Sequence, residues 1–232
     1  MKVLLFGATG MVGQGVLREC LLDPAVEQVL TVGRSEVGIQ HAKLRQIVHA
    51  DLMDLSPIAS QLEGLDACFF CLGISAAGMT EEAYRRVTYD YAMSVATTLV
   101  ERSPSMTFIF VSGIGTDNTG KSRMMWARVK GETENAIAKL PFSGTYMFRP
   151  GFIQPQHGIR SRTTAYRLFY AVLSPLYPLL RALLPRHVTS TEGVGRAMLE
   201  VARNGAPKQI LETADINLAA SSAVPQRDRA LT

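Results

Sequence analysis

The sequence predicts an α/β fold, a doubly wound parallel sheet with a small C-terminal helical cap. Short apolar runs alternate along the chain with longer amphipathic runs, as in a sheet whose strands are joined by helices. The short runs are apolar at consecutive positions, which is typical of strands buried on both faces. A glycine-rich turn joins the first short run to the first amphipathic run.

Strands are expected where the short apolar runs occur. They are residues 2–6, 28–32, 44–48, 66–71, 106–112 and 144–149, with a further short strand at 208–212. Helices are expected between strands, at residues 11–22, 81–102, 122–139 and 189–203. In the first helix, apolar residues recur at helical spacing on one face, and Pro24 ends the run.

Length and composition favour a single compact domain. The chain has 232 residues, of which 47% are hydrophobic and 19% are charged, and this composition excludes a disordered or collagen-like polymer. We expect one domain over residues 1–218, in which residues 151–205 form a cap on the substrate side. The small and polar residues 219–232 are expected to form a flexible tail.

Charge and cysteine usage restrict the partners and the compartment. The net charge is +4 and is thinly spread outside residues 160–187, so no nucleic-acid partner is expected. Three cysteines are too few for a disulfide framework and predict a reducing, cytoplasmic compartment. The apolar run after Lys2 is too short for a signal peptide. The histidines lack metal-ligand spacing, so no metal is expected.

Residues 160–187 are unusual because arginines flank two apolar runs that contain prolines. A membrane-spanning helix is not expected, since Pro175 and Pro178 would break it. Four interpretations remain: a lid over a substrate, a homodimer face, a patch lying on an anionic membrane, or core helices interrupted by proline. The lid is favoured over membrane contact.

Gly7, Gly10 and Gly13 lie between the first strand and the first helix, with Thr9, Met11 and Val12 among them. Glycines at this spacing let the backbone turn tightly and approach a diphosphate, while the helix N-terminus offers N–H groups to its oxygens. The motif predicts a dinucleotide-binding Rossmann fold.

The end of the second strand predicts which dinucleotide is bound. Proteins of this fold that choose NAD usually place an acidic residue there to bind the ribose 2′-hydroxyl. Here the chain carries Arg34 and Ser35, which suit a 2′-phosphate. We therefore expect NADP(H) to be preferred over NAD(H).

Two further segments at strand ends are expected to contact the cofactor. Asp51 and Leu52 follow the third strand and are placed to meet the adenine. Cys71, Leu72 and Gly73 end the fourth strand, where the backbone passes close to the cofactor. Cys68 and Cys71 have the spacing of a redox or zinc pair, but residues three apart in a strand point to opposite faces.

These motifs resemble the short-chain dehydrogenase/reductase superfamily, over about residues 1–215. The similarity is greatest to the extended and atypical branch, with members described as NAD-dependent epimerase/dehydratase-like or NAD(P)-binding. Besides the segments above, it depends on Ser112, on Lys130 within Val129–Glu134, and on Arg149, Pro150 and Gly151. Residues 129–134 are also similar to a reductase branch that includes a tumour suppressor.

The resemblance implies catalytic roles and shows one departure. Family members carry a Tyr four residues before the Lys, so that both lie on one helix face. In this sequence that position is Trp126, whose indole cannot act as a general acid or base. Lys130 is expected to hold the nicotinamide ribose and Ser112 to polarise a substrate carbonyl, and Arg149-Pro150-Gly151 is expected on the cofactor side.

Three interpretations of Trp126 remain open. Another residue could donate the proton, with Tyr89 and Tyr91 as candidates, or water or Lys130 could supply it. Alternatively, the protein is a non-catalytic NADP(H)-sensing regulator. The first hypothesis is an oxidoreductase for a small or apolar carbonyl or alcohol. Asp117, Asn118 and Lys121 are expected in a mobile loop over the site.

Overall fold

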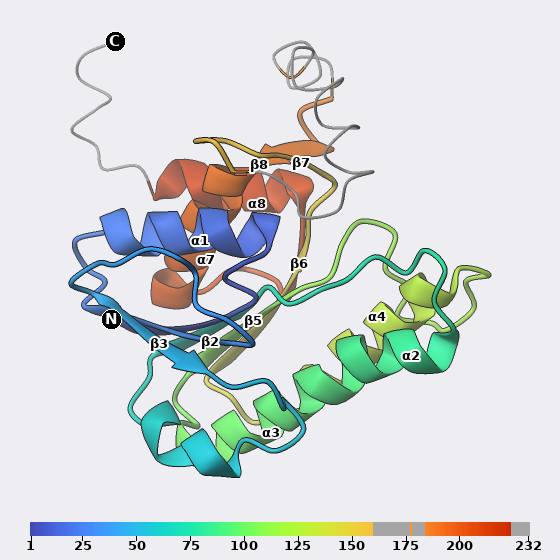
Figure 1. Cartoon of the computed structure of the whole chain (residues 1–232). Helices are drawn as coiled ribbons and strands as arrows, with labels where there is room; N and C mark the ends of the chain where they lie inside the picture. The colour runs from blue at the N-terminus through green and yellow to red at the C-terminus, as the bar shows by residue number, and fades with distance from the viewer. Residues whose placement is uncertain (160–176, 178–183, 224–232) are drawn as a thin grey trace, which may run out of the picture.

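The computed structural model describes residues 1–159, 177 and 184–223. Within these residues, a seven-stranded parallel sheet has the order β3-β2-β1-β4-β5-β6-β9 (Figure 1). The strands are β1 (Lys2–Phe6), β2 (Gln28–Gly33), β3 (Leu44–Val48), β4 (Ala67–Phe70), β5 (Thr107–Val111), β6 (Gly144–Arg149) and β9 (Ile210–Glu212). The strand order reverses between β1 and β4, so the predicted doubly wound α/β fold is confirmed.

Both faces of the sheet are buried, as the continuous apolar strands predict. In β1, Val3 and Leu5 belong to one core cluster, whereas Leu4 and Phe6 belong to the other. Consecutive residues of a strand point to opposite faces, so one short segment contributes to two cores. Cys68 and the partly buried Cys71 contribute to different clusters, which confirms that they face opposite sides of the sheet.

Helices cover the two faces separately (Figure 1). On one side lie α1 (Met11–Leu22) and α7 (Thr191–Asn204), which pack against each other. On the other side lie α3 (Tyr91–Arg102), α4 (Met125–Ile137) and the 3-10 helix η1 (Ser56–Leu62). Because α7 belongs to the layer that contains α1, this part of residues 151–205 covers the sheet and is not a separate cap.

The helix expected at residues 81–102 is divided into three consecutive segments. These are α2 (Glu81–Arg85), a π-helical turn η2 (Arg86–Asp90) and α3. The Thr80 hydroxyl caps α2 by accepting a hydrogen bond from the Ala83 N–H. A π-helical turn adds a residue to the turn and changes the direction in which the following side chains point, which sequence periodicity does not reveal.

Two short strands and a last helix complete the end of the sheet that carries the strand C-termini. Strand β7 (Phe152–Gln154) pairs in parallel with β8 (Val188–Ser190). Helix α8 (Thr213–Ser222) follows β9 and is fixed by a reciprocal capping box between Glu212 and Asp215. The expected tail is therefore wrong for residues 219–222, which are helical.

The segment 160–187 lies largely outside the described residues, as do residues 224–232. The lid, dimer-face and membrane-patch interpretations of 160–187 stay predictions for this reason. Among the helices that the structure describes, none has the length and apolar character needed to cross a bilayer.

Candidate functional site

The glycine-rich loop is folded tightly against the end of β4. Gly7 has a φ of +79°, and a Cβ atom there would lie 2.6 Å from the Cys71 carbonyl carbon. A Cβ atom at Gly13 would lie 2.0 Å from the Gly7 carbonyl oxygen, so a side chain at either position would collide with backbone. The Gly10 N–H donates to the same Gly7 oxygen at 2.9 Å, which closes the turn.

The N-terminus of α1 opens from this loop. Gly10 is its N-cap residue, no side chain in the described part of the chain caps the helix, and its first turn, which begins with Met11 and Val12, contains no acidic residue. The Gln14 side chain donates to the Thr9 carbonyl oxygen at 3.0 Å and fixes the loop from within. Uncapped N–H groups beside a close backbone turn suit the oxygens of a diphosphate, so the loop fits a dinucleotide.

Arg34 and Ser35 lie just beyond the end of β2, at the same edge of the sheet. Phe6 and Val32 are register partners in β1 and β2, so Arg34 follows β2 beside the loop that follows β1. Both side chains are exposed, and the Arg34 guanidinium forms no hydrogen bond or ion pair within the described part of the chain. A cation here is open to an added ligand.

The residues after β3 and β4 differ in how much surface they offer. The Asp51 carboxylate is exposed and accepts the Met53 N–H at 2.9 Å, whereas Leu52 is 6% exposed and packs in the core. Leu52 thus has little side-chain surface available for an adenine ring. After β4, the Leu72 N–H contacts Gly7, and Gly73 is exposed with open space around it.

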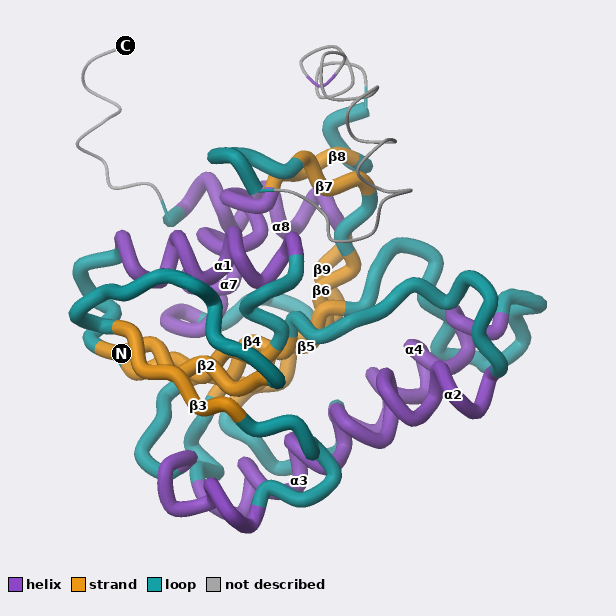
Figure 2. Tube along the Cα trace, viewed as in Figure 1, coloured by secondary structure: helices purple, strands orange, loops and turns teal. Residues whose placement is uncertain are grey.

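A cavity of about 380 Å³ lies next to this edge of the sheet. Its walls are residues 74–77, Tyr84, Trp126 and Lys130. They come from the loop after β4, from α2 and from α4, which Figure 2 shows beside one another. The Trp126 ring also packs on Gly115, because a Cβ atom there would lie 3.3 Å from the indole.

Lys130 is held in this cavity by backbone atoms of the β5 end. Its ammonium donates to the Ser112 carbonyl oxygen and lies beside Gly113. Burial lowers the pKa of Lys130 to about 8, and the negative charge of Glu134 opposes that shift. The ammonium is thus charged at neutral pH but loses its proton far more readily than a surface lysine.

The Ser112 hydroxyl points away from the cavity. It donates to Glu134 Oε1 at 2.5 Å and approaches the Phe148 carbonyl oxygen at 3.2 Å. Ser112 is 6% exposed and does not line the cavity with Lys130. The geometry differs from the expected role in polarising a substrate, because the one hydroxyl proton is already donated to a carboxylate.

Arg149 also turns inward. Its guanidinium donates to Glu134 at 3.0 and 2.5 Å, approaches Glu212 at 3.4 Å and contacts Asn118. The Glu134 side chain is fully buried, so this arginine balances an internal charge and does not reach out to a cofactor. The next two residues are equally engaged: the Pro150 carbonyl accepts the Ile114 N–H at 3.0 Å, and the Gly151 N–H donates to Thr213 at 2.8 Å.

Hydrogen bonds connect the loop between β5 and α4 to helix α4 and within itself. Asn118 donates to Glu134 at 2.9 Å and to Asn135 at 3.0 Å. The Asp117 carboxylate accepts the Thr119 N–H and hydroxyl, which lowers the pKa of Asp117 to about 2. Lys121 is exposed. Its polar residues thus bind helix α4 and one another, and the mobility expected of this loop stays a prediction.

Tyr84, which the sequence did not single out, is the tyrosine that lines the cavity with Lys130. It is 2% exposed. The two tyrosines expected as proton donors lie elsewhere. The Arg85 guanidinium carbon lies 4.2 Å from the centroid of the Tyr89 ring, and Tyr91 packs against the core. Neither lines this cavity. Helical spacing alone could not distinguish the three tyrosines.

A larger cavity, of about 630 Å³, lies between β8, α7 and α8. None of the residues expected to bind the cofactor lines it. The buried oxygens Gln156 Oε1 and Thr189 Oγ1 at its wall have no hydrogen-bond partner among the residues that the structure describes.

The sequence of residues 7–141 matches the family described as NAD(P)H-binding. The chain belongs to this family. The match begins at Gly7, the first glycine of the loop, and includes Lys130. The glycine loop and the candidate catalytic lysine therefore both lie within the matched residues. NAD(P) binding is therefore shown for the family to which the chain belongs, while the choice between the two dinucleotides is not.

Curated relatives agree with this assignment. The protein fmp52, mitochondrial, of Emericella nidulans is 30% identical over 73% of this chain and 74% of its own length. The protein HTATIP2 of Rattus norvegicus is 28% identical over 66% of this chain and 62% of its own length.

Solved structures confirm the fold. A UDP-glucose 4-epimerase has a TM-score of 0.66 at 16% identity, covering 96% of this chain and 82% of that one. The enzyme WbmF of Bordetella bronchiseptica, solved in complex with NAD⁺, has a TM-score of 0.65 at 14% identity, covering 95% and 77%. These two likenesses show that the chain shares the fold of both enzymes.

Proposed function

We propose that this chain is an oxidoreductase that uses NADP(H) and acts on a small or apolar carbonyl or alcohol. The observation that carries the proposal is the position of the Lys130 ammonium. It lies in a cavity whose wall of residues 74–77 follows Leu72 and Gly73, and Leu72 lies against Gly7 of the glycine loop. A cofactor held by that loop would extend along this wall toward Lys130.

The residues that would hold the cofactor lie along one edge of the sheet. Gly7, Gly10 and Gly13 with the N-terminus of α1 would bind the diphosphate, and Asp51 would accept the adenine amino group. Lys130 would donate to the nicotinamide ribose hydroxyls. When bound, the nicotinamide supplies or accepts a hydride. The chain's own contribution is to orient the reactants and to move the accompanying proton.

The preference for NADP(H) follows from the cation at the end of β2. Arg34 is exposed beside the loop that follows β1, and its guanidinium is not engaged by a described residue. A guanidinium binds a phosphate through two parallel hydrogen bonds, and the Ser35 hydroxyl adds a third donor.

An apolar substrate is supported by the cavity wall. Four of the seven lining residues have apolar side chains or an indole ring, while the other three carry polar groups: Ile74, Ala76, Ala77 and Trp126 against Ser75, Tyr84 and Lys130. A site with a few polar groups in an apolar wall selects a substrate with one polar centre, such as a carbonyl on a hydrocarbon.

The substitution at Trp126 favours a second candidate function, an NADP(H)-sensing regulator without catalysis. Oxidation of NADPH by the purified protein, measured with aldehydes, ketones and quinones, distinguishes the two. We expect turnover with at least one apolar carbonyl. Calorimetric binding of NADPH without turnover of any of them would support the regulator, and no binding would contradict both.

The cytosolic location stays a prediction. It depends on cysteine usage, whereas the fungal relatives carry the word mitochondrial in their names. Cell fractionation with compartment markers tests it: recovery with the mitochondrial marker would contradict it.

A further inference from the structure

We infer that the Tyr84 phenol supplies the proton that accompanies hydride transfer, in place of the tyrosine absent at position 126. This inference rests on the proposed function and deepens it. Tyr84 lines the same cavity of about 380 Å³ as Trp126 and Lys130, although it comes from a different helix. The cavity thus contains a phenol and an ammonium, the two groups that the missing tyrosine would have brought together on α4.

Two ion pairs fix α2 on α4 on either side of Tyr84. Glu81 accepts from Arg128 at 2.6 Å, and one turn later Arg85 donates to Glu132 at 2.7 Å. Both pairs join residues 47 positions apart, so α2 and α4 run side by side with a constant offset over this turn. Tyr84 lies between the two pairs on α2, as Lys130 does on α4, and the register brings both to the same level.

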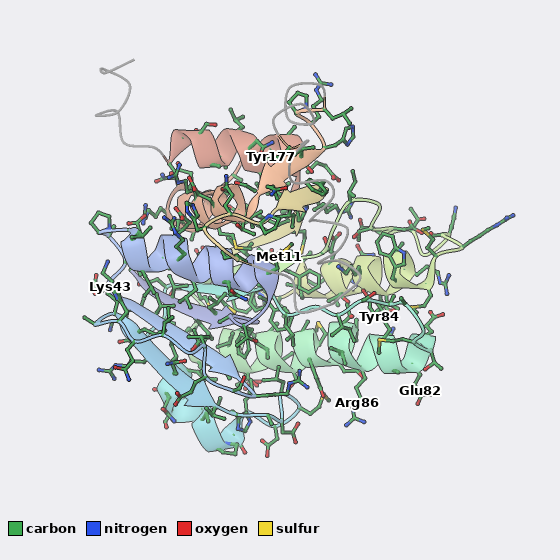
Figure 3. All side chains as sticks on the ribbon, turned by 45° about the horizontal axis from the view of Figure 1, so that its top comes forward. Met11, Lys43, Glu82, Tyr84, Arg86 and Tyr177 are labelled. Carbon is green, nitrogen blue, oxygen red and sulfur yellow. The ribbon has the colours of Figure 1, made fainter. Side chains whose placement is uncertain are left out.

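The Tyr84 side chain faces α4. Figure 3 shows it between the two helices, whereas its neighbours Glu82 and Arg86 project outward. Tyr84 is 2% exposed, and Glu82 and Arg86 are both exposed. The π-helical turn that follows α2 starts at Arg86, so the side chains that come after it have a different phase. Tyr84 precedes this break and lines the cavity. Tyr89 and Tyr91 lie within the turn or after it and do not line the cavity.

The chemistry of the pair suits proton donation to a carbonyl oxygen. During reduction the hydride of the reduced dinucleotide bonds to the carbonyl carbon, and the C=O π electrons move to the oxygen. The Tyr84 O–H bond breaks and its proton bonds to that oxygen, which yields the alcohol. The phenolate left behind is stabilised by the Lys130 ammonium in the same cavity and takes a proton from solvent before the next turnover.

The test compares Tyr84→Phe with Tyr146→Phe, which loses a tyrosine hydroxyl that contacts the Ala206 N–H in a different part of the fold. Two quantities are measured: kcat for NADPH-dependent carbonyl reduction, and carbonyl binding without cofactor from the fluorescence of Trp126, the chain's one tryptophan. We expect Tyr84→Phe to lower kcat about 100-fold, to leave the carbonyl Kd within about threefold, and Tyr146→Phe to keep the parent kcat.

A rescue variant separates chemistry from packing. Trp126→Tyr in the Tyr84→Phe background places a phenol four residues before Lys130, and we expect it to recover about tenfold or more of the lost kcat. Wild-type kcat retained by Tyr84→Phe would overturn the role of Tyr84 and leave the proposed function intact. No turnover by the wild type with any carbonyl would overturn both.

Discussion

The Ser112 hydroxyl donates to the buried Glu134 carboxylate, 2.5 Å away. The backbone and the side chain of Ser112 therefore have different roles. Ser112 positions the Lys130 ammonium through its backbone carbonyl, while its side chain joins the internal network of Glu134 and Arg149. The end of β5 is thus tied to α4 and β6 by the same residues that hold the candidate catalytic lysine.

A Ser112→Ala variant should therefore be less stable but still active. Losing a hydrogen bond to a charged acceptor should lower the free energy of unfolding by about 2 kcal/mol, with kcat changed less than about threefold. Urea denaturation and NADPH oxidation give the two numbers. A fall in kcat of about 100-fold with unchanged stability would restore Ser112 to a catalytic role.

Glu134→Gln should be strongly destabilising. It leaves the Arg149 guanidinium, which is 11% exposed, without its main counter-charge, and we expect a loss of about 3 kcal/mol. Glu63→Gln is the matched control, since it breaks a surface ion pair with Arg102 that is worth about 1 kcal/mol or less. Equal urea midpoints for the two variants would show that the buried network contributes little.

The buried Lys130 should make stability depend on pH. Its pKa is lowered from 10.5 to about 8 in the folded protein, so the unfolded chain binds more protons between these values. The stability of wild type relative to Lys130→Met should rise by up to about 3 kcal/mol between pH 8 and 10.5. It should be lost again as the pH falls through 8. A difference independent of pH would show that Lys130 is solvated.

Arg34→Ala should weaken NADPH binding selectively. Removing a charge-assisted contact to the 2′-phosphate should raise the NADPH Kd about 10- to 100-fold, with the NADH Kd unchanged. Arg102→Ala, which removes an arginine at the end of α3, serves as the control. An equal effect of Arg34→Ala on both dinucleotides would assign Arg34 a role other than phosphate recognition.

Local patterns predicted the sheet, the glycine loop and the strand ends well. Phe6 and Leu4 alternate with Leu5 and Val3 between two cores, and this follows from a continuous apolar strand. Gly7 and Gly13 could be recognised from their spacing alone, because the tight turn that they form depends on local backbone geometry rather than on residues distant in the chain.

Contacts between residues far apart in the chain could not be predicted. Ser112 and Arg149 were assigned outward roles because Glu134 and Glu212, their partners on α4 and β9, gave no local signal. Tyr84 was missed because its position depends on the packing of α2 on α4 and on the π-helical turn. Helix α8 was not predicted, because its capping box is formed by Glu212 and Asp215, without the usual Ser or Thr.

Isothermal titration calorimetry of the folded wild-type protein with NADPH and with NADH tests the central claim most directly. We expect one NADPH to bind per chain, about tenfold or more tightly than NADH, because Arg34 and Ser35 add contacts that only the 2′-phosphate can use. Absence of binding heat with either dinucleotide would contradict the account.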